Sequence, residues 1–371
     1  MKKILALILA LILVFALAAC GQAAEKPAET KDDTQRLNNM TLDEIIAEAK
    51  SIGRLDTIGM PDDWCNYGNL FAALKEDYGL EHTDVDMGSS EEIALIEAEK
   101  DAPTKSMGEV GQQYAQICID KGIVQGYKPT TWDSVPDWAK DEDGYWMIGY
   151  TGATAFMTNV DSVGKEISSW KQIKDDLDNG TLDYKITLGD PTTGACSQHF
   201  ILAAAYALGG DINNIQPALD FFAELAKAGG LDAGEGTYAR FEKGEIDVLC
   251  DWDYNIIQNL PDNMNVAVHV PSDQGVASGY VTIISRWAPQ AAGAALAREW
   301  LFSDAGQLNV AACGAKPVRS DVVIPDDICA YKIPDSEYED LIYTASMMEE
   351  WIATAATIPE LWEDNVLPYI N

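Results

Sequence analysis

Short β-rich runs alternate with helical patterns along most of the chain, and this alternation limits the possible folds more than any other feature. In each case an apolar, β-branched run precedes a longer stretch with helical spacing. Alternation of this kind predicts α/β units around largely parallel sheets. The four pairs are "RLDTIGM" (54–60) with "GNLFAALKEDYGL" (68–80), "HTDVDMG" (82–88) with "SSEEIALIEAEKDA" (89–102), "YKITLGDP" (184–191) with "CSQHFILAAAYALGG" (196–210), and "IDVLCDWD" (246–253) with "YNIIQNL" (254–260).

Several helix ends carry their own signals. A helix is predicted to start at Ser89, because Glu91 and Glu92 would lie in its first turn, where the helix dipole favours negative charge. The glycine pairs 209–210 and 229–230 are placed to end two other helices with a left-handed residue.

Two longer β-rich runs, 144–161 and 275–289, exceed the length of one ordinary strand and are predicted to cross between two lobes. The body of about 330 residues is also longer than a usual single-core domain. We therefore expect a cleft between two lobes. The expected boundaries are 41–153 for the first part of lobe 1, 154–275 for lobe 2, and 276–371 for the second part of lobe 1, with the C-terminal helices packed on that lobe.

The N-terminus has the layout of a signal peptide over residues 1–19, with Lys2 and Lys3 before an apolar stretch that is short for a membrane span. The sequence "LAAC", which ends at Cys20, resembles the bacterial lipobox. That resemblance implies that Cys20 becomes the lipidated N-terminus; an uncleaved anchor is the alternative. Residues 20–40 contain almost no large apolar side chains, so they are predicted to form a flexible tether.

The chain is strongly acidic, with 60 Asp and Glu residues against 25 Lys and Arg residues. Removing the leader takes away Lys2 and Lys3 and leaves 23 basic residues, for a formal charge of −37. Nucleic acid is excluded as a partner because phosphate binding needs clustered cations. The acidity favours cationic ligands only weakly.

The cysteines and histidines show no metal-binding pattern. Six cysteines follow Cys20 without a C-x-x-C pair, and an exported chain allows either disulfides or buried thiols among them. The three histidines lie far apart in unrelated contexts. We expect neither a metal nor a cofactor. The six cysteines are Cys65, Cys118, Cys196, Cys250, Cys313 and Cys329.

A set of motifs in a fixed order resembles the extracellular solute-binding proteins of ABC importers, in the branch that includes ferric-ion, thiamine, polyamine and sugar-phosphate binders. The resemblance covers nearly all of residues 41–371. It implies a type II periplasmic-binding-protein fold, a monomer that closes on a small-molecule ligand, and delivery to the transmembrane subunits of a permease. The motifs are "GMPDDWCNYGN", "APTKSMGEVGQQYA", "GDPTTGA", "FEKGEIDVLCDWDYN", "REWLFSDAGQ" and "AKPVRSDV".

Ligands of open α/β sheets bind beyond the carboxyl ends of strands, and this rule selects candidate loops. After the first strand, Asp62, Asp63 and Trp64 could hold an amine through charge and a cation–π contact, or they could cap and pack a helix. In the second lobe, amides and hydroxyls before a helix suit an anion, although capping explains the same hydroxyls. These second-lobe residues are Thr192, Thr193, Gly194 and Ser197.

Two further loops and the first crossing complete the candidate site. Trp252, Asp253 and Tyr254 could stack on a ligand and pair with a positive group, with a core tryptophan and capping aspartates as the alternative. Iron-binding relatives have two adjacent tyrosines at this place, and the single Tyr254 therefore favours an organic ligand. Arg319 could clamp an anionic group or pair with a neighbouring carboxylate, and Tyr150 could contribute from the crossing strand.

An enzyme is not expected, since the sequence contains no G-x-S-x-G, H-E-x-x-H or glycine-rich phosphate signature. Adjacent carboxylates such as Asp62 and Asp63 leave a surface glycan hydrolase as an alternative from another class, and an adhesion or sensor module as a third. The preferred hypothesis is a lipid-anchored, extracytoplasmic transport receptor for a polyamine- or thiamine-like cation. Phosphorylated organic anions or ferric ion are the alternative ligands.

Overall fold

A mixed sheet of 11 strands forms the centre of the computed structural model, which describes residues 33–326, 328 and 333–370. Its main path runs β2-β1-β3-β9-β5-β7-β6, and the short strands β4, β8, β10 and β11 pair along β5 and β9. The strands are β1 (Arg54–Ile58), β2 (Glu81–Thr83), β3 (Met107–Gly111), β4 (Val124–Gln125), β5 (Trp146–Asn159), β6 (Ile186–Thr187), β7 (Val248–Trp252), β8 (Val266–His269), β9 (Val276–Ser285), β10 (Lys316–Pro317) and β11 (Ile342–Tyr343).

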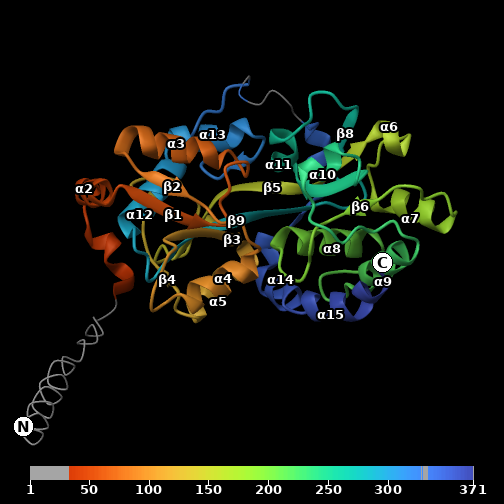
Figure 1. Ribbon diagram of the computed structural model, residues 1–371, viewed down its shortest axis with the longest axis horizontal. Helices are drawn as coiled ribbons and strands as arrows, with labels where there is room; N and C mark the ends of the chain where they lie inside the picture. The colour runs from red at the N-terminus through yellow and green to blue at the C-terminus, as the bar shows by residue number, and fades with distance from the viewer. Residues whose placement is uncertain (1–32, 327, 329–332, 371) are drawn as a thin grey trace, which may run out of the picture. The chain divides into compact units, whose positions relative to one another are not determined.

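Helices cover the sheet, as Figure 1 shows. The α-helices are α2 (Leu42–Ile52), α3 (Tyr67–Tyr78), α4 (Ser89–Ala98), α5 (Ala115–Asp120), α6 (Val160–Val163), α7 (Trp170–Asp178), α8 (Ala195–Ala207), α9 (Gln216–Lys227), α10 (Tyr238–Glu242), α11 (Asp253–Gln258), α12 (Ala291–Leu301), α13 (Asp304–Ala312), α14 (Met348–Ala355) and α15 (Ile358–Asn365). Short 3-10 helices lie at Asp33–Gln35, Leu37–Asn39, Gln112–Tyr114, Trp132–Ser134, Asp137–Ala139, Asp335–Tyr338, Thr344–Met347 and Leu367–Tyr369.

The alternating pattern predicted from the sequence is confirmed, but the prediction of a largely parallel sheet is wrong. The long strands β5 and β9 pair antiparallel with each other, and they pair antiparallel with β7 and β3. Each of the four pairs forms a strand followed by a helix, namely β1 with α3, β2 with α4, β6 with α8, and β7 with α11. Helix α4 begins at Ser89 as expected, and the Gly88 amide before it donates to the Glu91 carboxylate at 3.2 Å. Gly209 and Gly229 have φ angles of 92° and 77°, which is the left-handed conformation predicted for a helix end.

Strands β5 and β9 are the two predicted crossings, and they join the lobes. The first half of β5 pairs with β9, and its second half pairs with β7 and β8. The register between β5 and β9 shifts between Ile148 and Thr151, and β5 changes partner from β9 to β7 between Ala153 and Thr154. In Figure 1 these long strands run through the middle of the sheet, between β1–β3 on one side and β6–β8 on the other. The chain thus has the two-lobed, type II periplasmic-binding-protein fold.

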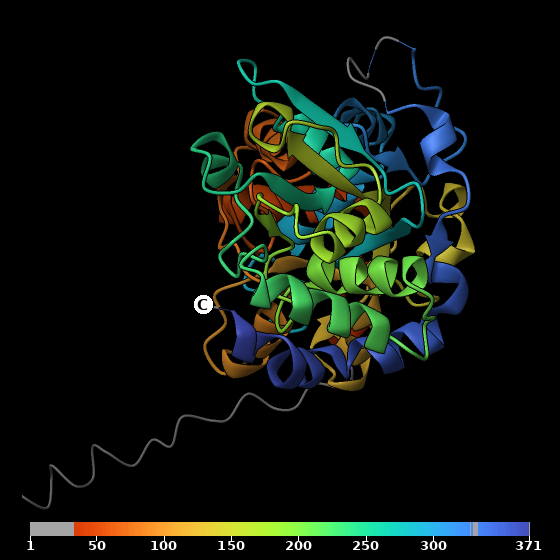
Figure 2. The ribbon, with the colours of Figure 1, turned by 90° about the vertical axis from the view of Figure 1, so that its right-hand side faces the viewer.

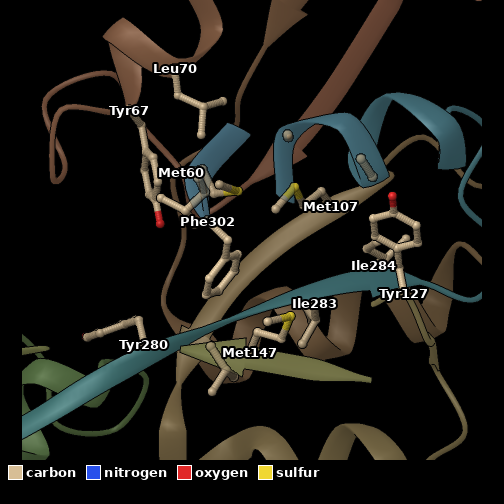
Figure 3. Packing of buried hydrophobic residues seen from close by; sticks show 14 of the residues in the cluster. Met60, Tyr67, Leu70, Met107, Tyr127, Met147, Tyr280, Ile283, Ile284 and Phe302 are labelled. Carbon is tan, nitrogen blue, oxygen red and sulfur yellow. The ribbon is translucent and has the colours of Figure 1, made fainter. Parts of the chain in front are cut away.

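The first lobe has its own apolar core, built on β1, β3 and the first half of β5. Helices α2, α3, α12 and α13 pack on this part of the sheet. Figure 3 shows Met60, Tyr67 and Phe302 approaching one another within this core, although Phe302 is distant in sequence from the other two. Each of these three side chains is fully buried.

The second lobe has a separate core around Trp170, which contacts Phe156, Phe200, Phe221 and Phe222 at ring-centroid distances of 4.8–6.3 Å. Helices α8 and α9 supply most of its apolar surface. A smaller cluster on the other face of the second-lobe strands includes Met157, Phe241 and Ile256.

Helices α14 and α15 pack on the second core, which corrects the expectation that the whole of 276–371 belongs to the first lobe. Trp351, Ile358 and Trp362 are buried there, and the Trp362 ring lies 5.5 Å from that of Phe222. Figure 2 shows these blue C-terminal helices beneath the green helices of the second lobe. An amphipathic pattern predicts that one face is buried, but it does not identify the surface that covers that face.

The expected tether extends less far than predicted. Leu37 is fully buried in the first core, and the Asn38 side chain accepts a hydrogen bond from the Lys128 amide at 2.7 Å. Residues 34–40 therefore belong to the folded body, because Leu37 is buried in the first core and Met40 packs against it. The signal peptide and Cys20 lie outside the described residues. Within the described part of the chain, no helix combines the length and the apolar character needed to span a membrane.

Candidate functional site

A cleft with a volume of about 510 Å³ lies between the two lobes. The first lobe contributes the residues after β1, the start of α4 and the strand β3. The second lobe contributes the loop before α8 and the loop before α10. The described lining residues are Gly59, Trp64, Asp86, Met87, Gly88, Ser89, Glu91, Glu92, Glu109, Gly189, Asp190, Thr193, Gly194, Ala195, Cys196, Glu235, Gly236, Thr237 and Tyr280.

Carboxyl groups dominate the charge of this cleft. Six of the described lining residues are acidic, and no described lining residue is Lys, Arg or His. Both lobes contribute to the group, so a cation in the cleft would be attracted from two sides. The six are Asp86, Glu91, Glu92, Glu109, Asp190 and Glu235.

Glu109, on β3, lies in a hydrogen-bonded network on the first-lobe wall. One carboxylate oxygen accepts from the Tyr67 hydroxyl, and the other accepts from the Tyr150 hydroxyl at 2.7 Å. The Tyr150 hydroxyl in turn accepts from Trp64 Nε1 at 2.7 Å. Burial raises the pKa of Glu109 to about 7, although these donors stabilise its charged form.

Glu92 is the second buried carboxyl of this wall and comes from the first turn of α4. Its side chain is almost fully buried, and its Oε2 atom has no hydrogen-bond partner among the described residues. Burial, followed by the charges of Glu109, Asp84 and Asp86, raises the pKa of Glu92 well above its ordinary value. An unpaired buried oxygen at the cleft is a strong acceptor for a ligand donor.

Gly59 provides the space that Glu92 occupies. Its φ angle is 66°, and a Cβ atom built on it would collide with the Glu92 carboxylate. The chain therefore needs glycine here both for the left-handed turn after β1 and for the close approach of the carboxyl group.

Asp86 follows β2 at the same edge of the sheet. Burial raises its pKa, and the negative charges of Asp84, Asp63 and Glu235 raise it further. Since Glu235 comes from the second lobe, the two lobes repel each other across the cleft. A ligand cation would relieve this repulsion.

Trp64 and Tyr280 form the aromatic part of the lining. Their rings meet edge to face at a centroid distance of 5.1 Å. The Trp64 indole is fixed by its hydrogen bond to Tyr150, so one aromatic surface is already oriented before a ligand enters.

The second-lobe wall consists of the turn before α8. The Gly194 amide donates to the Asp190 carbonyl at 2.9 Å, while the Asp190 carboxylate accepts from the amide and the hydroxyl of Thr192. Thr193 and Gly194 line the cleft, whereas Thr192 lines a separate, smaller cavity beside α14. Ser197 is buried one turn into α8.

The structure brings only some of the sequence-predicted residues to the cleft. Trp64, Thr193 and Gly194 line it, and Tyr150 lies behind Trp64 in contact with Glu109. The remaining predicted residues are not among the described lining residues. These are Asp62, Asp63, Thr192, Ser197, Trp252, Asp253, Tyr254 and Arg319.

Trp252, Asp253 and Tyr254 are core residues in this structure. The Trp252 ring is fully buried, and its centroid lies 5.1 Å from that of His199. Asp253 is also buried, and its carboxylate accepts from the amides of Ala153 and Tyr254. Trp252 is thus a core tryptophan and Asp253 an acceptor of backbone amides, which is the alternative that the sequence left open.

Arg319 forms a structural ion pair. Its guanidinium bonds Asp321 at 2.8 Å and Asp304 at 2.9 Å, and it also donates to the Phe302 carbonyl. The side chain is only 6% exposed, so its hydrogen-bonding capacity is directed at the protein.

None of the six cleft carboxyl groups was among the residues predicted from the sequence. Asp86 follows β2, so the rule that ligands bind beyond the carboxyl ends of strands would have selected it. Glu109 is the middle residue of β3, and the rule does not select it. No group of three or more His, Cys, Asp or Glu side chains among the described residues is arranged to hold a metal ion.

Comparison with known families identifies the chain. Residues 109–330 match the model of the bacterial extracellular solute-binding proteins. The chain belongs to this family. A bacterial extracellular solute-binding protein acts outside the cytoplasm, and the interlobe cleft is where this fold has room for a solute. No curated protein matches the chain.

Solved structures of similar fold cover nearly the whole body of this solute-binding protein. The periplasmic binding protein P5PA is 16% identical, with a TM-score of 0.67 and coverage of 85% of this chain and 99% of its own. AfuA from Actinobacillus pleuropneumoniae, solved with fructose-6-phosphate, is 17% identical, with a TM-score of 0.64 and coverage of 84% and 98%. Iron-bound HitA from Pseudomonas aeruginosa is 14% identical, with a TM-score of 0.62 and coverage of 83% and 98%.

Proposed function

We propose that this protein captures a small organic cation, such as a polyamine or a thiamine-like molecule, and delivers it to an ABC permease. The observation that carries the proposal is the cleft lining, in which six carboxyl groups come from both lobes without a basic residue among the described lining residues. A cation in this cleft neutralises carboxyl groups that otherwise repel each other.

The first-lobe wall supplies the specific contacts. Glu92 offers a buried oxygen without a hydrogen-bond partner among the described residues. Glu109 accepts hydrogen bonds from Tyr67 and Tyr150, and with a pKa of about 7 it is only partly ionised at neutral pH. The Trp64 ring adds a cation–π surface. Since a bound cation favours the ionised form of Glu109, affinity should be higher at pH 8 than at pH 6.

The second-lobe wall makes binding depend on closure. Asp190 and Glu235 line the cleft from the loops that precede α8 and α10. A ligand that contacts both walls stabilises the closed arrangement, and a permease would recognise that arrangement. The lipid anchor proposed at Cys20 would keep the receptor near the membrane.

A phosphorylated organic anion is the second candidate, favoured by the N-terminus of α8. Thr193, Gly194 and Ala195 line the cleft where that 13-residue helix begins, and such a terminus attracts anions. The surrounding carboxyl groups oppose this ligand. Ferric ion has less support still, because Tyr254 is buried and its ring packs against Trp64 and Tyr150.

Calorimetric titration with spermidine, putrescine, thiamine and fructose 6-phosphate tests the proposal. Asp86→Asn and Asp190→Asn each remove one cleft charge, from opposite lobes, and should weaken binding of the amine about tenfold or more. Glu363→Gln, an exposed carboxyl on α15, is the matched control and should bind as the wild type does. Saturable binding of fructose 6-phosphate without binding of any amine would refute the proposal.

A further inference from the structure

Cys65 and Cys313 lie 248 residues apart in the sequence, but their Sγ atoms are 3.5 Å apart in the first core. Both side chains are buried, at 0% and 2% exposure. Among the described cysteines, this is the pair whose sulfur atoms are in contact. Cys118 and Cys250 are buried elsewhere, and Cys196 contacts the Asp251 carboxylate instead.

The backbone on both sides holds the two sulfurs together. Asn66, next to Cys65, donates from its side chain to the Asn309 carbonyl at 3.0 Å, and Asn309 returns a bond to the Asn66 carbonyl at 3.1 Å. Cys313 follows Ala312, the last residue of α13. These two hydrogen bonds thus hold the turn before α3 next to α13, so the two thiols lie close together without a covalent link.

The backbone at Cys65 and Asn66 is unusual in its own right. Their φ angles are 46° and 57°, two consecutive non-glycine residues in the left-handed region. Such a conformation persists only where surrounding contacts enforce it. Here it turns the Cys65 side chain toward α13 while Trp64, one residue earlier, lines the cleft.

We propose that Cys65 and Cys313 form a disulfide in the mature, exported protein. The family acts outside the cytoplasm, where disulfides form and persist. The two sulfurs, 3.5 Å apart, need to approach to a bonding distance of about 2 Å to make the link. The bond would tie the loop that carries Trp64 to the last turn of α13, so one wall of the cleft would be covalently fixed.

The oxidant is a disulfide, either of an extracytoplasmic thiol oxidoreductase or of a small thiol. The Cys65 thiolate attacks one sulfur of that disulfide and displaces one thiolate. The Cys313 thiolate then attacks the mixed disulfide, the protein disulfide forms, and a second thiolate leaves. The oxidant thus gains two electrons, and the two protons lost by the protein thiols are taken up by the released thiolates. Because both cysteines are buried in the folded chain, this exchange takes place before folding is complete.

Alkylation and peptide mapping test the proposal. The full chain, exported by a bacterial host, is denatured in N-ethylmaleimide without reductant and digested. The expected result is a linked peptide pair containing Cys65 and Cys313, with Cys118, Cys196 and Cys250 alkylated. Alkylated Cys65 and Cys313 in the exported chain, or a link from either one to a different cysteine, would overturn the proposal.

Thermal unfolding gives a second, independent measurement. Reduction should lower the unfolding midpoint of the wild type by about 5 °C or more, because a link across 248 residues restricts the unfolded chain. The same reduction should leave the midpoint of the Cys65→Ser, Cys313→Ser double variant unchanged. Cys118→Ser is the matched control and should keep the full shift, and an equal shift in the double variant would contradict the assignment. Neither measurement uses a ligand, so the outcome is separate from that of the proposed function.

Discussion

Replacing Glu109 with Gln should change how the stability of this protein depends on pH. The carboxyl is 1% exposed, and burial raises its pKa in the folded protein to about 7 from an ordinary value of 4.5. Gln keeps a side-chain oxygen that can accept from Tyr67 or Tyr150, so the variant removes the ionisable group while retaining an acceptor.

The size of the effect follows from the two pKa values. As pH rises above 4.5, Glu109 loses its proton first in the unfolded chain, so the folded state is destabilised until pH reaches about 7. A difference of about 2.5 between the pKa values corresponds to about 3 kcal/mol. The wild type should therefore lose about 3 kcal/mol between pH 4.5 and pH 8 through this one group, and Glu109→Gln should not lose it.

Urea unfolding of both proteins without ligand, measured from pH 4.5 to pH 8, checks this expectation. The free energy of unfolding of the variant minus that of the wild type should become more positive by about 3 kcal/mol across the range. Glu363→Gln removes an exposed carboxyl on α15, which is not among the cleft residues, and should follow the wild-type curve. A pH-independent difference between Glu109→Gln and the wild type would show that the Glu109 pKa is not raised, and would remove its part in the proposed site.

Three further predictions follow from individual residues. Trp252→Ala should lower the free energy of unfolding by about 3–5 kcal/mol, because the ring is fully buried; an unchanged urea midpoint with weaker ligand binding would place the ring at the ligand instead. Gly59→Ala should lower stability more than Gly164→Ala, since both glycines have left-handed φ angles but only the first would press a Cβ atom against Glu92; equal midpoints would refute this. Cys20→Ser should release the protein from the membrane fraction, and a cleaved form that stays there would contradict lipidation at Cys20.

Much of the fold could be predicted from local sequence patterns. The alternation that begins with "RLDTIGM" gives β1 and α3, and the two long apolar runs give β5 and β9. Packing between distant segments was harder to predict. Leu37 and Met40 are the apolar residues of a short polar stretch, and the sequence of α14 does not show which lobe covers its apolar face. Both depend on surfaces that form only in the folded chain.

The site was predicted less well than the fold, for a physical reason. In β7 both faces of the sheet are buried, so the sequence does not show that Trp252 turns into the core rather than toward the cleft. Glu109 lies in a strand whose residues are all buried, and only the hydroxyl groups of Tyr67 and Tyr150 explain how a carboxyl is tolerated there. Those partners are 42 and 41 residues away in sequence.

Thermal unfolding of the protein with matched cationic and anionic compounds tests the central claim most directly. Putrescine, spermidine and thiamine are compared with fructose 6-phosphate and a ferric salt at equal concentration and ionic strength. A ligand at 100 times its dissociation constant adds about 2.7 kcal/mol to the stability of the folded state, which raises the midpoint measurably. The acidic cleft predicts a rise with at least one amine and none with the phosphate. A rise with fructose 6-phosphate alone would contradict a cation receptor and would assign ligand binding to the N-terminus of α8.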